Sequence, residues 1–338
     1  MPVLPPPGNI RRIRLLWIGR LGDILVTTPL FAALRARFPQ AHISLVAGEA
    51  GAAGAGLCAE LDEVRILRRF YHPRSNLSLA FSLLSEPADL LIDLNTAPSR
   101  SSILLAGLSR AKTKIAFSRG AGDGLFTRLI AAAAESEPMM DRYGRLAAAL
   151  EAPYEPRWRV RVPEAARGAA RAELAALKNT AAEKWVLLHP GNFKKSENRW
   201  PEDKFAALAE RLSALAGIRV AFLAGPGEDA EVGAIAARLS RPAPVLGRRD
   251  IAQTAALLAE AALVVVNATG TAHLAVAAGA RVFALVSRYS ATVWMPKPGY
   301  PRYDCVMAPS WESCREIEVE EAWSGLRRAL QSAGLARE

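Results

Sequence analysis

The sequence is poor in the residue types that build disulfide scaffolds and metal centres. Its 338 residues include 3 cysteines and 4 histidines, and no two cysteines form a Cys-x-x-Cys pair. Cys58, Cys305 and Cys314 leave one thiol over under any disulfide pairing, which is typical of proteins from a reducing compartment. We therefore expect a cytoplasmic protein that has no structural zinc site.

Long apolar runs are also missing. The most apolar region, residues 261–286, is interrupted by Asn267, His273 and Arg281, whereas a membrane span needs roughly 20 predominantly apolar residues. The first residues, MPVLPPPGNIRRIR, carry prolines where an export signal has an apolar core of about 7 to 15 residues. We expect a soluble protein with neither a membrane span nor a signal peptide.

Acidic residues are fewer than basic residues. Lys and Arg number 43 against 33 Asp and Glu, a formal net charge of +10, which predicts an acidic partner such as nucleic acid, an anionic membrane surface or a phosphorylated substrate. The cations are dispersed, and no zinc-finger spacing, RNP-like strand or basic tail accompanies them, so nucleic acid is disfavoured. Many are ordinary surface charges, but the segment RRFYHPR at 68–74 sets Phe70 and Tyr71 among cations, as in a loop at a membrane interface.

What the sequence does contain is a regular alternation of strand and helix patterns in two series. Such alternation predicts an α/β fold of parallel strands with helices on both faces, here as two doubly wound domains. Prolines around residues 153–163 mark the boundary, giving domains 1–160 and 161–338 and an expected ligand cleft between them. The last helix is a candidate to pack back on the first domain. The expected strands cover 13–18, 42–47, 64–67, 90–94 and 114–117, then 185–189, 220–224, 244–246, 263–267 and 282–286. The expected helices include 31–38 and 101–106, then 202–216, 229–239, 252–261 and 272–279.

The segment IRLLWIGRLGDILVTTPL at 13–30 is the most informative for function. It predicts a buried strand, a tight glycine turn and a helix with Asp23 at its start, facing the ligand crevice of an open α/β sheet. On these residues alone Asp23 is more commonly a helix N-cap than a catalytic base. A third fingerprint glycine is missing, and no acid follows at the expected distance, so a nicotinamide dinucleotide site is disfavoured.

Three polar loops follow strands of the second half and should meet at one edge of the second sheet. They are 190–201 with Lys194, Lys195 and Arg199, 225–229 with Glu228, and 268–273 at the start of a helix of small residues. Backbone amides at that helix start, with Gly270 allowing close approach, would suit a diphosphate. Alternatively Thr269 or Thr271 caps the helix and His273 is an internal histidine with its hydrogen bonds satisfied.

Taken together, these segments resemble glycosyltransferase family 9, the ADP-heptose:lipopolysaccharide heptosyltransferases, over nearly the whole length. The order and spacing of the matching segments carry the resemblance more than any one of them. They are RLGDILVTTPLFAALRARFPQAHISLVAG at 20–48, LLIDLNTAPSRSSILL at 90–105, LLHPGNFKKSENRWPEDKFAALAERL at 187–212, VLGRRDIAQTAALLAEAALVVVNATGTAHLAVAAGARVFAL at 245–285, and CREI at 314–317.

The resemblance implies the GT-B architecture, two facing Rossmann-like domains with the acceptor bound mainly by the first and the nucleotide-sugar donor by the second. It implies that Asp23 is the general base. The residues it implies for the acceptor are Gly22, Asn95, Arg100 and Arg119. Those it implies for the donor are Asn192, Lys194, Lys195, Arg199, Glu228, Asn267, Thr269, Gly270, Thr271 and His273.

The implied activity is inverting, metal-independent transfer of heptose from ADP-L-glycero-D-manno-heptose to the inner core of lipopolysaccharide, with no cofactor. The implied partners are the nucleotide sugar, an anionic lipid A-core acceptor and the inner face of the inner membrane, where the protein would be peripheral. Two alternatives stay open, because Ala268 stands where the family usually has Asp and Asn198 where it commonly has Lys. One is a relative that uses another nucleotide sugar or acceptor, and the other is a non-catalytic nucleotide-sugar-binding protein on a degenerate scaffold. The oligomeric state is also open.

Overall fold

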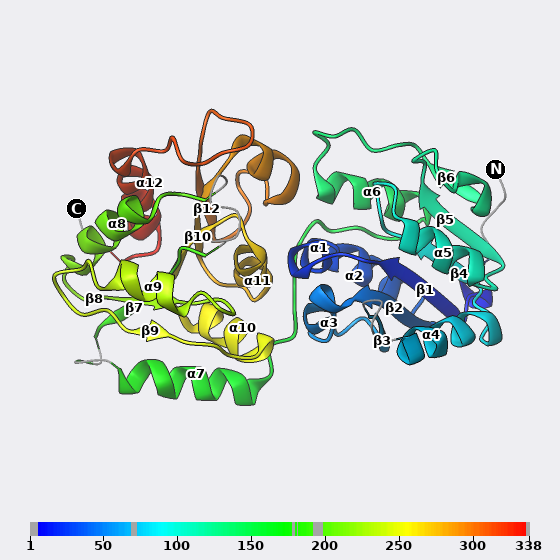
Figure 1. Cartoon of the computed structure of the whole chain (residues 1–338), viewed down its shortest axis with the longest axis horizontal. Helices are drawn as coiled ribbons and strands as arrows, with labels where there is room; N and C mark the ends of the chain where they lie inside the picture. Colours follow the sequence, from blue (N-terminus) through cyan, green and yellow to red (C-terminus); the bar gives the residue numbers. More distant parts are fainter. Residues whose placement is uncertain (1–5, 69–72, 178–179, 181, 192–198, 336–338) are drawn as a thin grey trace. The chain divides into compact units, whose positions relative to one another are not determined.

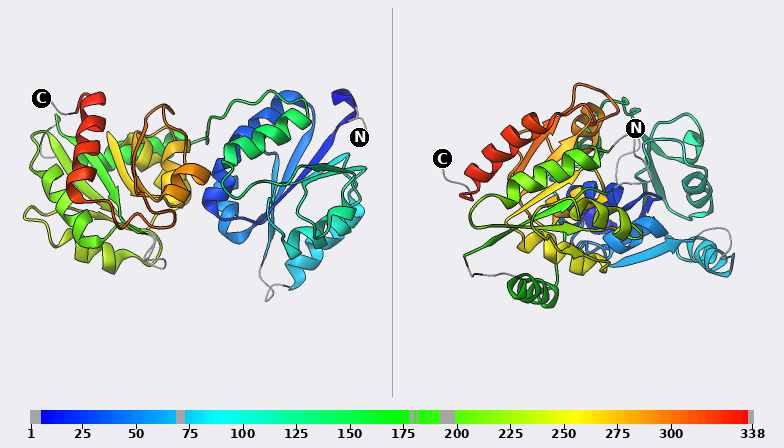
Figure 2. Two further views of the ribbon diagram at one scale, coloured as in Figure 1. Left: turned by 90° about the horizontal axis from the view of Figure 1, so that it is seen from above. Right: turned by 60° about the vertical axis from the view of Figure 1, so that its left-hand side comes forward.

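The chain forms two compact α/β units, Met1–Arg161 and Val162–Glu338, each of which is described here by itself (Figures 1 and 2). The computed structural model describes residues 6–68, 73–177, 180, 182–191 and 199–335. No helix among these residues is long and apolar enough to cross a membrane.

The first unit is built on a six-stranded parallel sheet with the order β3-β2-β1-β4-β5-β6. Its central strand β1 pairs with β2 on one side and β4 on the other, so the direction of the chain connections reverses between β1 and β4. In a doubly wound sheet this reversal opens a crevice at the carboxyl ends of the two strands. The strands are β1 Arg12–Trp17, β2 His42–Gly48, β3 Glu63–Leu67, β4 Leu90–Asp93, β5 Thr113–Phe117 and β6 Arg128–Ile130.

Helices pack on this first sheet in two groups. α4 packs beside α5, and their side chains Leu79, Leu83 and Leu105 share one buried cluster with Leu16 and Val46 of the sheet. α1 packs on α3 and α2 packs on α6. The helices are α1 Leu21–Val26, α2 Thr28–Arg37, α3 Glu49–Ala55, α4 Pro73–Ser85, α5 Arg100–Leu108 and α6 Met139–Ala149, with 3₁₀ turns at Pro7–Asn9 and Asp123–Leu125.

The second unit repeats the arrangement. Its parallel sheet has the order β12-β11-β10-β7-β8-β9, which along the chain is the same winding as in the first unit. The strands are β7 Lys184–His189, β8 Ile218–Leu223, β9 Val245–Leu246, β10 Leu263–Asn267, β11 Val282–Val286 and β12 Tyr303–Met307. The helices are α7 Glu164–Ala176, α8 Glu202–Ser213, α9 Asp229–Ala236, α10 Ile251–Glu260, α11 Gly270–Ala277 and α12 Val319–Ser332, with a π-helical turn at Ser290–Trp294.

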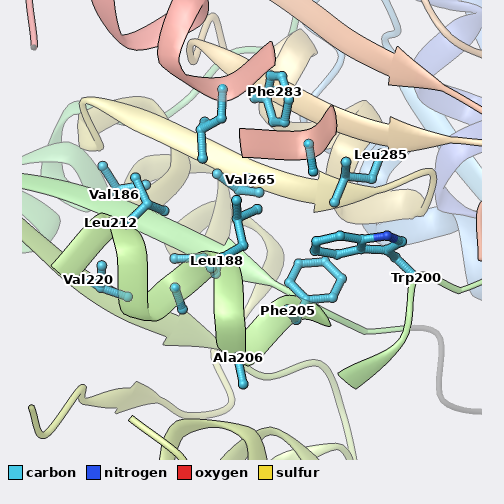
Figure 3. Packing of buried hydrophobic residues seen from close by; sticks show 14 of the residues in the cluster. Val186, Leu188, Trp200, Phe205, Ala206, Leu212, Val220, Val265, Phe283 and Leu285 are labelled. Atoms are coloured by element: carbon cyan, nitrogen blue, oxygen red, sulfur yellow. The ribbon is translucent and has the colours of Figure 1, made fainter. Parts of the chain in front are cut away.

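Trp200 anchors the core between this sheet and α8 (Figure 3). Its fully buried indole packs edge-on against Phe205, with ring centroids 5.1 Å apart, and its Nε1–H donates to the carbonyl of Ile317 at 2.8 Å. An aromatic residue that fills the core while its polar atom is paired adds stability without a buried unsatisfied donor. Trp200 therefore fixes where the chain returns to the core ahead of α8.

The two series of parallel strands predicted from the sequence are confirmed, and the ends of most strands shift by one or two residues. The strands β6 and β12 were missed, because β6 has only three residues and β12 is a half-exposed edge strand. Such strands lack the continuous apolar run that marks a strand buried on both faces. The last helix, α12, packs against α8, β11 and β12 of its own sheet.

Gly325 of α12 lies tight against this sheet and generates a stability prediction. A Cβ atom there would lie 2.7 Å from Cγ2 of Val306, whereas one at Gly168 of α7 would meet nothing within 4 Å. We expect Gly325→Ala to lower the free energy of unfolding by about 1–3 kcal/mol through overpacking. Gly168→Ala, the matched control, should raise it by about 0.5–1 kcal/mol because alanine is the better helix former. Urea denaturation measures both, and equal effects of the two substitutions would contradict the close packing of α12.

Candidate functional site

Asp23 lies in the first turn of α1, directly beyond the carboxyl end of β1. Its Oδ2 accepts a hydrogen bond of 2.6 Å from the backbone amide of Arg20, the N-cap residue. The prediction of Asp23 as the N-cap itself is therefore wrong by three positions. The carboxylate reaches back to the cap residue's own amide, as an acid at the third helical position does in a capping box.

The backbone around Asp23 is held firmly. Its carbonyl accepts hydrogen bonds from the indole of Trp17 at 2.8 Å and the hydroxyl of Thr27 at 2.7 Å. A side chain at Gly19 would collide with the carboxylate, since its Cβ would lie 2.8 Å from Oδ2. Within the described part of the chain no protein donor bonds to Oδ1 of this half-buried residue, so one carboxylate oxygen is held and the other is available. Gly22 lies beside it in the same turn.

A buried polar cluster lies at the carboxyl end of the neighbouring strand β4. The side chains of Asp93 and Arg119 form an ion pair that is almost completely buried. Asn95 donates from Nδ2 to Oδ1 of Asp93 at 2.6 Å, and its carbonyl accepts from Arg119 at 2.9 Å. Asn95 and Arg119, both expected at the acceptor, are thus brought together through Asp93, which the sequence analysis missed. The sequence does contain a sign of its role, because Asp93 is an acidic residue at the end of the otherwise apolar strand LLID.

The Arg119 guanidinium has 1% of its side-chain surface exposed and stacks over the ring of Phe126 at 5.4 Å. It therefore positions the Asn95 loop in this structure and does not face solvent. Arg100, by contrast, is exposed at the first position of α5. Another cation, Arg142, is buried and donates to Thr96 Oγ1 at 3.0 Å, which supports the same loop from α6.

Asn267 joins three segments at the carboxyl edge of the second sheet. Its Nδ2 donates to the carbonyl of Pro190 at 3.0 Å, and its Oδ1 accepts from the amide of Trp200 at 3.3 Å. The Cys314 thiol also lies 3.9 Å from Oδ1. The predicted donor residue Asn267 thus uses its amide inside the protein and sets the positions of both ends of the 190–200 loop.

His189 and Glu228 lie together between two glycines. Nδ1 of His189 is 2.9 Å from the carbonyl oxygen of Leu223, so the neutral ring donates from that nitrogen. Burial lowers the pKa of His189 below its usual value, and the Leu223 carbonyl and the Glu228 charge offset this only in part, so the ring is neutral at pH 7. A Cβ at Gly191 or Gly225 would come within 2.7 Å of Glu228 Oε2, which also accepts from the Gly225 amide at 3.1 Å. Only glycines allow this carboxylate so close to the backbone.

The N-terminus of α11 lies at the same edge. Thr269 is the N-cap by backbone geometry, yet its hydroxyl makes no capping bond, and Oγ1 is buried without a hydrogen-bond partner among the described residues. Thr269 is therefore the N-cap residue by position, as one interpretation predicted, but its side chain does not cap the helix, and Thr271 lies inside the helix. His273 is largely buried and its Nδ1 lies 2.8 Å from the Thr269 carbonyl, which fits an internal histidine. Gly270 begins the helix, whose first amides lack intrahelical acceptors.

The basic loop before α8 is described only at its ends. Arg199 is buried and pairs with Glu202 at 2.7 Å, so its charge lies close to the start of α8. Asn192, Lys194, Lys195 and Asn198 lie outside the described residues, as do Phe70 and Tyr71. Within the described ranges no group of three or more His, Cys, Asp and Glu side chains is arranged to hold a metal ion.

Each unit thus gathers candidate groups at the carboxyl edge of its sheet. The first edge offers a carboxylate with one uncommitted oxygen. The second offers helix amides, a hydroxyl with no partner in the described part of the chain, a neutral imidazole and a buried cation, a set of groups that suits an anionic ligand. A proton acceptor and an anion site are the two components that a group-transfer reaction with an anionic leaving group needs.

The Asp93–Arg119 pair generates a second prediction. Arg119→Leu removes one partner of a buried ion pair, so we expect it to lower the free energy of unfolding by about 3–5 kcal/mol. Adding Asp93→Asn should restore part of this loss, because no buried charge is then left alone. Urea denaturation of the two single variants and the double variant gives the coupling. A loss below about 1 kcal/mol in Arg119→Leu, the level of a surface pair, would contradict the burial of this cluster.

Three solved structures resemble the chain closely in fold. A family 9 glycosyl transferase from Veillonella parvula DSM 2008 has 18% identity and a TM-score of 0.83, covering 95% of this chain and 97% of that one. E. coli ADP-heptose lps heptosyltransferase II has 20% identity and a TM-score of 0.76, covering 96% and 99%. E. coli heptosyltransferase WaaC, solved with ADP-2-deoxy-2-fluoro heptose, has 19% identity and a TM-score of 0.71, covering 94% and 99%. At this level of identity the likeness shows the fold, which confirms the predicted GT-B-like pair of Rossmann-like units.

A search of curated proteins by sequence finds no match. The family profile described as glycosyltransferase family 9 (heptosyltransferase) matches residues 76–321, which is most of the chain. These residues include the Asp93 cluster of the first unit and the loops at the carboxyl edge of the second sheet. The chain therefore belongs to glycosyltransferase family 9, the heptosyltransferases, and is a glycosyltransferase.

Proposed function

We propose that this glycosyltransferase moves heptose from ADP-L-glycero-D-manno-heptose to the inner core of lipopolysaccharide, with inversion at the anomeric carbon and without a metal ion or other cofactor. The acceptor would be lipid A carrying Kdo, or a heptosyl residue already added to it. One observation carries the proposal: Asp23 holds one carboxylate oxygen against the Arg20 amide and leaves the other uncommitted, in a chain that belongs to the heptosyltransferase family.

In the proposed reaction Asp23 acts as general base. It takes the proton from an acceptor hydroxyl while that oxygen forms a bond to the anomeric carbon of the donor. The bond between this carbon and the diphosphate oxygen breaks on the opposite face, and ADP leaves with the electron pair. A single displacement of this kind inverts the anomeric configuration, and the acid that results returns its proton to water.

The leaving diphosphate would be held at the carboxyl edge of the second sheet. Donors that are already in place stabilise the charge that develops on a leaving group, because they need not reorganise during the reaction. The first amides of α11 and the Thr269 hydroxyl are such donors, and Arg199 supplies positive charge. Asn192, Lys194 and Lys195 of the neighbouring loop, together with Thr271, Gly270 and His273, complete the proposed donor set. Glu228 would accept hydrogen bonds from the sugar hydroxyls.

The acceptor side rests on the first unit. Arg100 is exposed and would meet acidic groups of the acceptor directly, while Arg119 and Asn95 would act by positioning the loop that follows β4. The net charge of +10 favours a phosphorylated glycolipid over a neutral acceptor. We place the reaction in the cytoplasm at the inner face of the inner membrane, with the protein peripheral to the bilayer.

A second candidate is a family relative that uses another nucleotide sugar. The observation that favours it is Ala268, which puts a methyl group between Asn267 and the helix cap Thr269, where a carboxylate could otherwise contact the donor. Non-catalytic binding of a nucleotide sugar is the third candidate, and the presence of Asp23 in the α1 turn weighs against it. Transfer assays and nucleotide titrations separate these candidates.

Asp23→Asn tests the base. The amide oxygen of Asn can still accept from the Arg20 amide, so the turn should keep its structure while the base is lost. We expect the rate of transfer from ADP-heptose to a heptose-free lipid A–Kdo acceptor to fall by about 10²–10⁴-fold. Asp203→Asn in the first turn of α8 is the matched control and should leave the rate unchanged. Adding the metal chelator EDTA to the wild type should also leave the rate unchanged, because the proposed reaction needs no metal ion. A rate within about threefold of the wild type in Asp23→Asn would exclude Asp23 as the base.

Thr269→Val tests the donor site. The Thr269 hydroxyl has no hydrogen-bond partner among the described residues, so replacing it with a methyl group should not lower the unfolding free energy. If the hydroxyl instead bonds to the diphosphate, ADP affinity in calorimetric titration should fall about tenfold, by roughly 1.4 kcal/mol. Thr254→Val in the first turn of α10 is the matched control and should bind ADP like the wild type.

Titrating UDP and GDP beside ADP identifies the donor. We expect ADP to bind most tightly, and preference for UDP or GDP would favour the second candidate. Binding of ADP without transfer to any acceptor would favour the non-catalytic candidate, and no binding of any of the three nucleotides would refute all three.

A further inference from the structure

The helices α4 and α5 of the first unit carry large apolar side chains that point away from the core. Leu77 is 68% exposed, Phe81 72% and Leu84 45% on α4, and Leu104 is 63% exposed on α5. These four residues, which we term the α4–α5 surface, include the most exposed large hydrophobic residues of the described chain. A cluster of this kind is unusual on a protein surface that faces only water, and it commonly marks an interaction site.

The spacing along α4 shows that the outward face is separate from the core face. Leu79 and Leu83 lie four residues apart and are buried against the sheet. Leu77, Phe81 and Leu84 follow the i, i+4, i+7 pattern of a single helix face, about half a turn away from the buried pair. α4 is therefore apolar on two opposite faces. Among the described residues, the face with Leu79 and Leu83 packs against the sheet, and the face with Leu77, Phe81 and Leu84 is exposed.

The two helices present this surface side by side. α4 packs along α5, and Leu79, Leu83, Leu105 and Ala106 of the two helices belong to the same buried cluster, which also contains residues of the sheet. The outward side chains of α4 and that of Leu104 on α5 thus lie on one layer of the fold.

The two helices that carry the surface have charged side chains of one sign only. Neither α4 nor α5 contains an Asp or Glu, and each has one exposed arginine in its first turn, Arg74 in α4 and Arg100 in α5. The acids that follow α4 are neutralised locally, Glu86 by Arg65 at 2.6 Å and Asp89 by Lys112 at 2.7 Å. Apolar side chains combined with exposed cations are complementary to an anionic lipid surface.

We propose that the α4–α5 surface docks on an anionic lipid bilayer, with Leu77, Phe81, Leu84 and Leu104 inserted at the interface, Arg74 on the headgroup phosphates and Arg100 on the acidic groups of the lipid-borne acceptor. Helices in a parallel α/β fold begin at the carboxyl edge of the sheet, so both arginines lie on the edge from which α1 carries Asp23. A bilayer on this surface would present a lipid-borne acceptor near the base. This inference rests on the proposed function for its acceptor, but the docking can be measured without transfer.

The test is flotation of the full-length protein with vesicles of phosphatidylethanolamine and phosphatidylglycerol, against vesicles of phosphatidylcholine alone. We expect the wild type to bind the anionic vesicles and to be released at high salt. The variant Leu77→Gln/Phe81→Gln should bind at least about tenfold more weakly, because it loses two large inserted side chains. The matched control Leu177→Gln/Met307→Gln removes two exposed apolar residues from the second unit and should bind like the wild type.

Three results would overturn the docking proposal. The first is a wild type that floats with no vesicle, and the second is equal binding by the two double variants. The third is a wild-type dimer in light scattering that Leu77→Gln/Phe81→Gln converts to a monomer, since the surface would then bind a second copy of this chain.

Transfer to a deacylated, water-soluble acceptor is measured in parallel. A double variant that loses flotation but keeps this transfer supports both proposals, whereas flotation without any transfer by the wild type retains the docking and refutes the function.

Discussion

The constraint on which the rest of the structure depends is the parallel direction of every strand in each sheet. Because the strands run the same way, their carboxyl ends and the loops that leave them meet at one edge, and each candidate group is at the end of a strand, on such a loop or near the start of the helix that follows. Asp23 follows β1, Asp93 is the last residue of β4, and Thr269 follows β10. The continuous apolar runs that form the strands are thus also what brings polar residues distant in sequence together.

Buried polar groups hold these edges in shape. In the second unit one side chain, Asn267, satisfies the carbonyl of Pro190 and the amide of Trp200, so the basic loop between them starts and ends at set positions. In the first unit the Asp93–Arg119 pair does the same for the loop after β4. Unpaired, these groups would each cost several kcal/mol, so they favour one loop arrangement strongly over others. In the proposed function these groups place other residues and do not touch the reacting atoms.

The sequence predicts the buried parts of this molecule better than the polar ones. Both ends of the strand Leu263–Asn267 were predicted at the correct residue, because a strand that is buried on both faces requires a continuous apolar run. The sequence places Asp23 in the turn after β1, but it does not show that the helix already begins at Leu21. Nor does any sequence pattern show the hydrogen bond from the Arg20 amide to the Asp23 carboxylate. The family resemblance implies Arg119 for the acceptor, but its pairing with Asp93 could not be predicted, because the two residues are 26 positions apart and meet only in the folded sheet. The short strand β6 and the edge strand β12 carry too little apolar sequence to be seen.

The central claim is a single displacement at the anomeric carbon, with Asp23 of the first unit as the base and the edge around Asn267 and Thr269 of the second as the site of the leaving diphosphate. The measurement that tests it most directly is the anomeric configuration of the product, determined by NMR after transfer from ADP-heptose to a lipid A–Kdo acceptor. We predict one molecule of ADP released per product formed, and a product whose anomeric configuration is opposite to that of the donor. A product that retains the configuration of the donor would contradict the claim, because retention requires two displacements or a different mechanism.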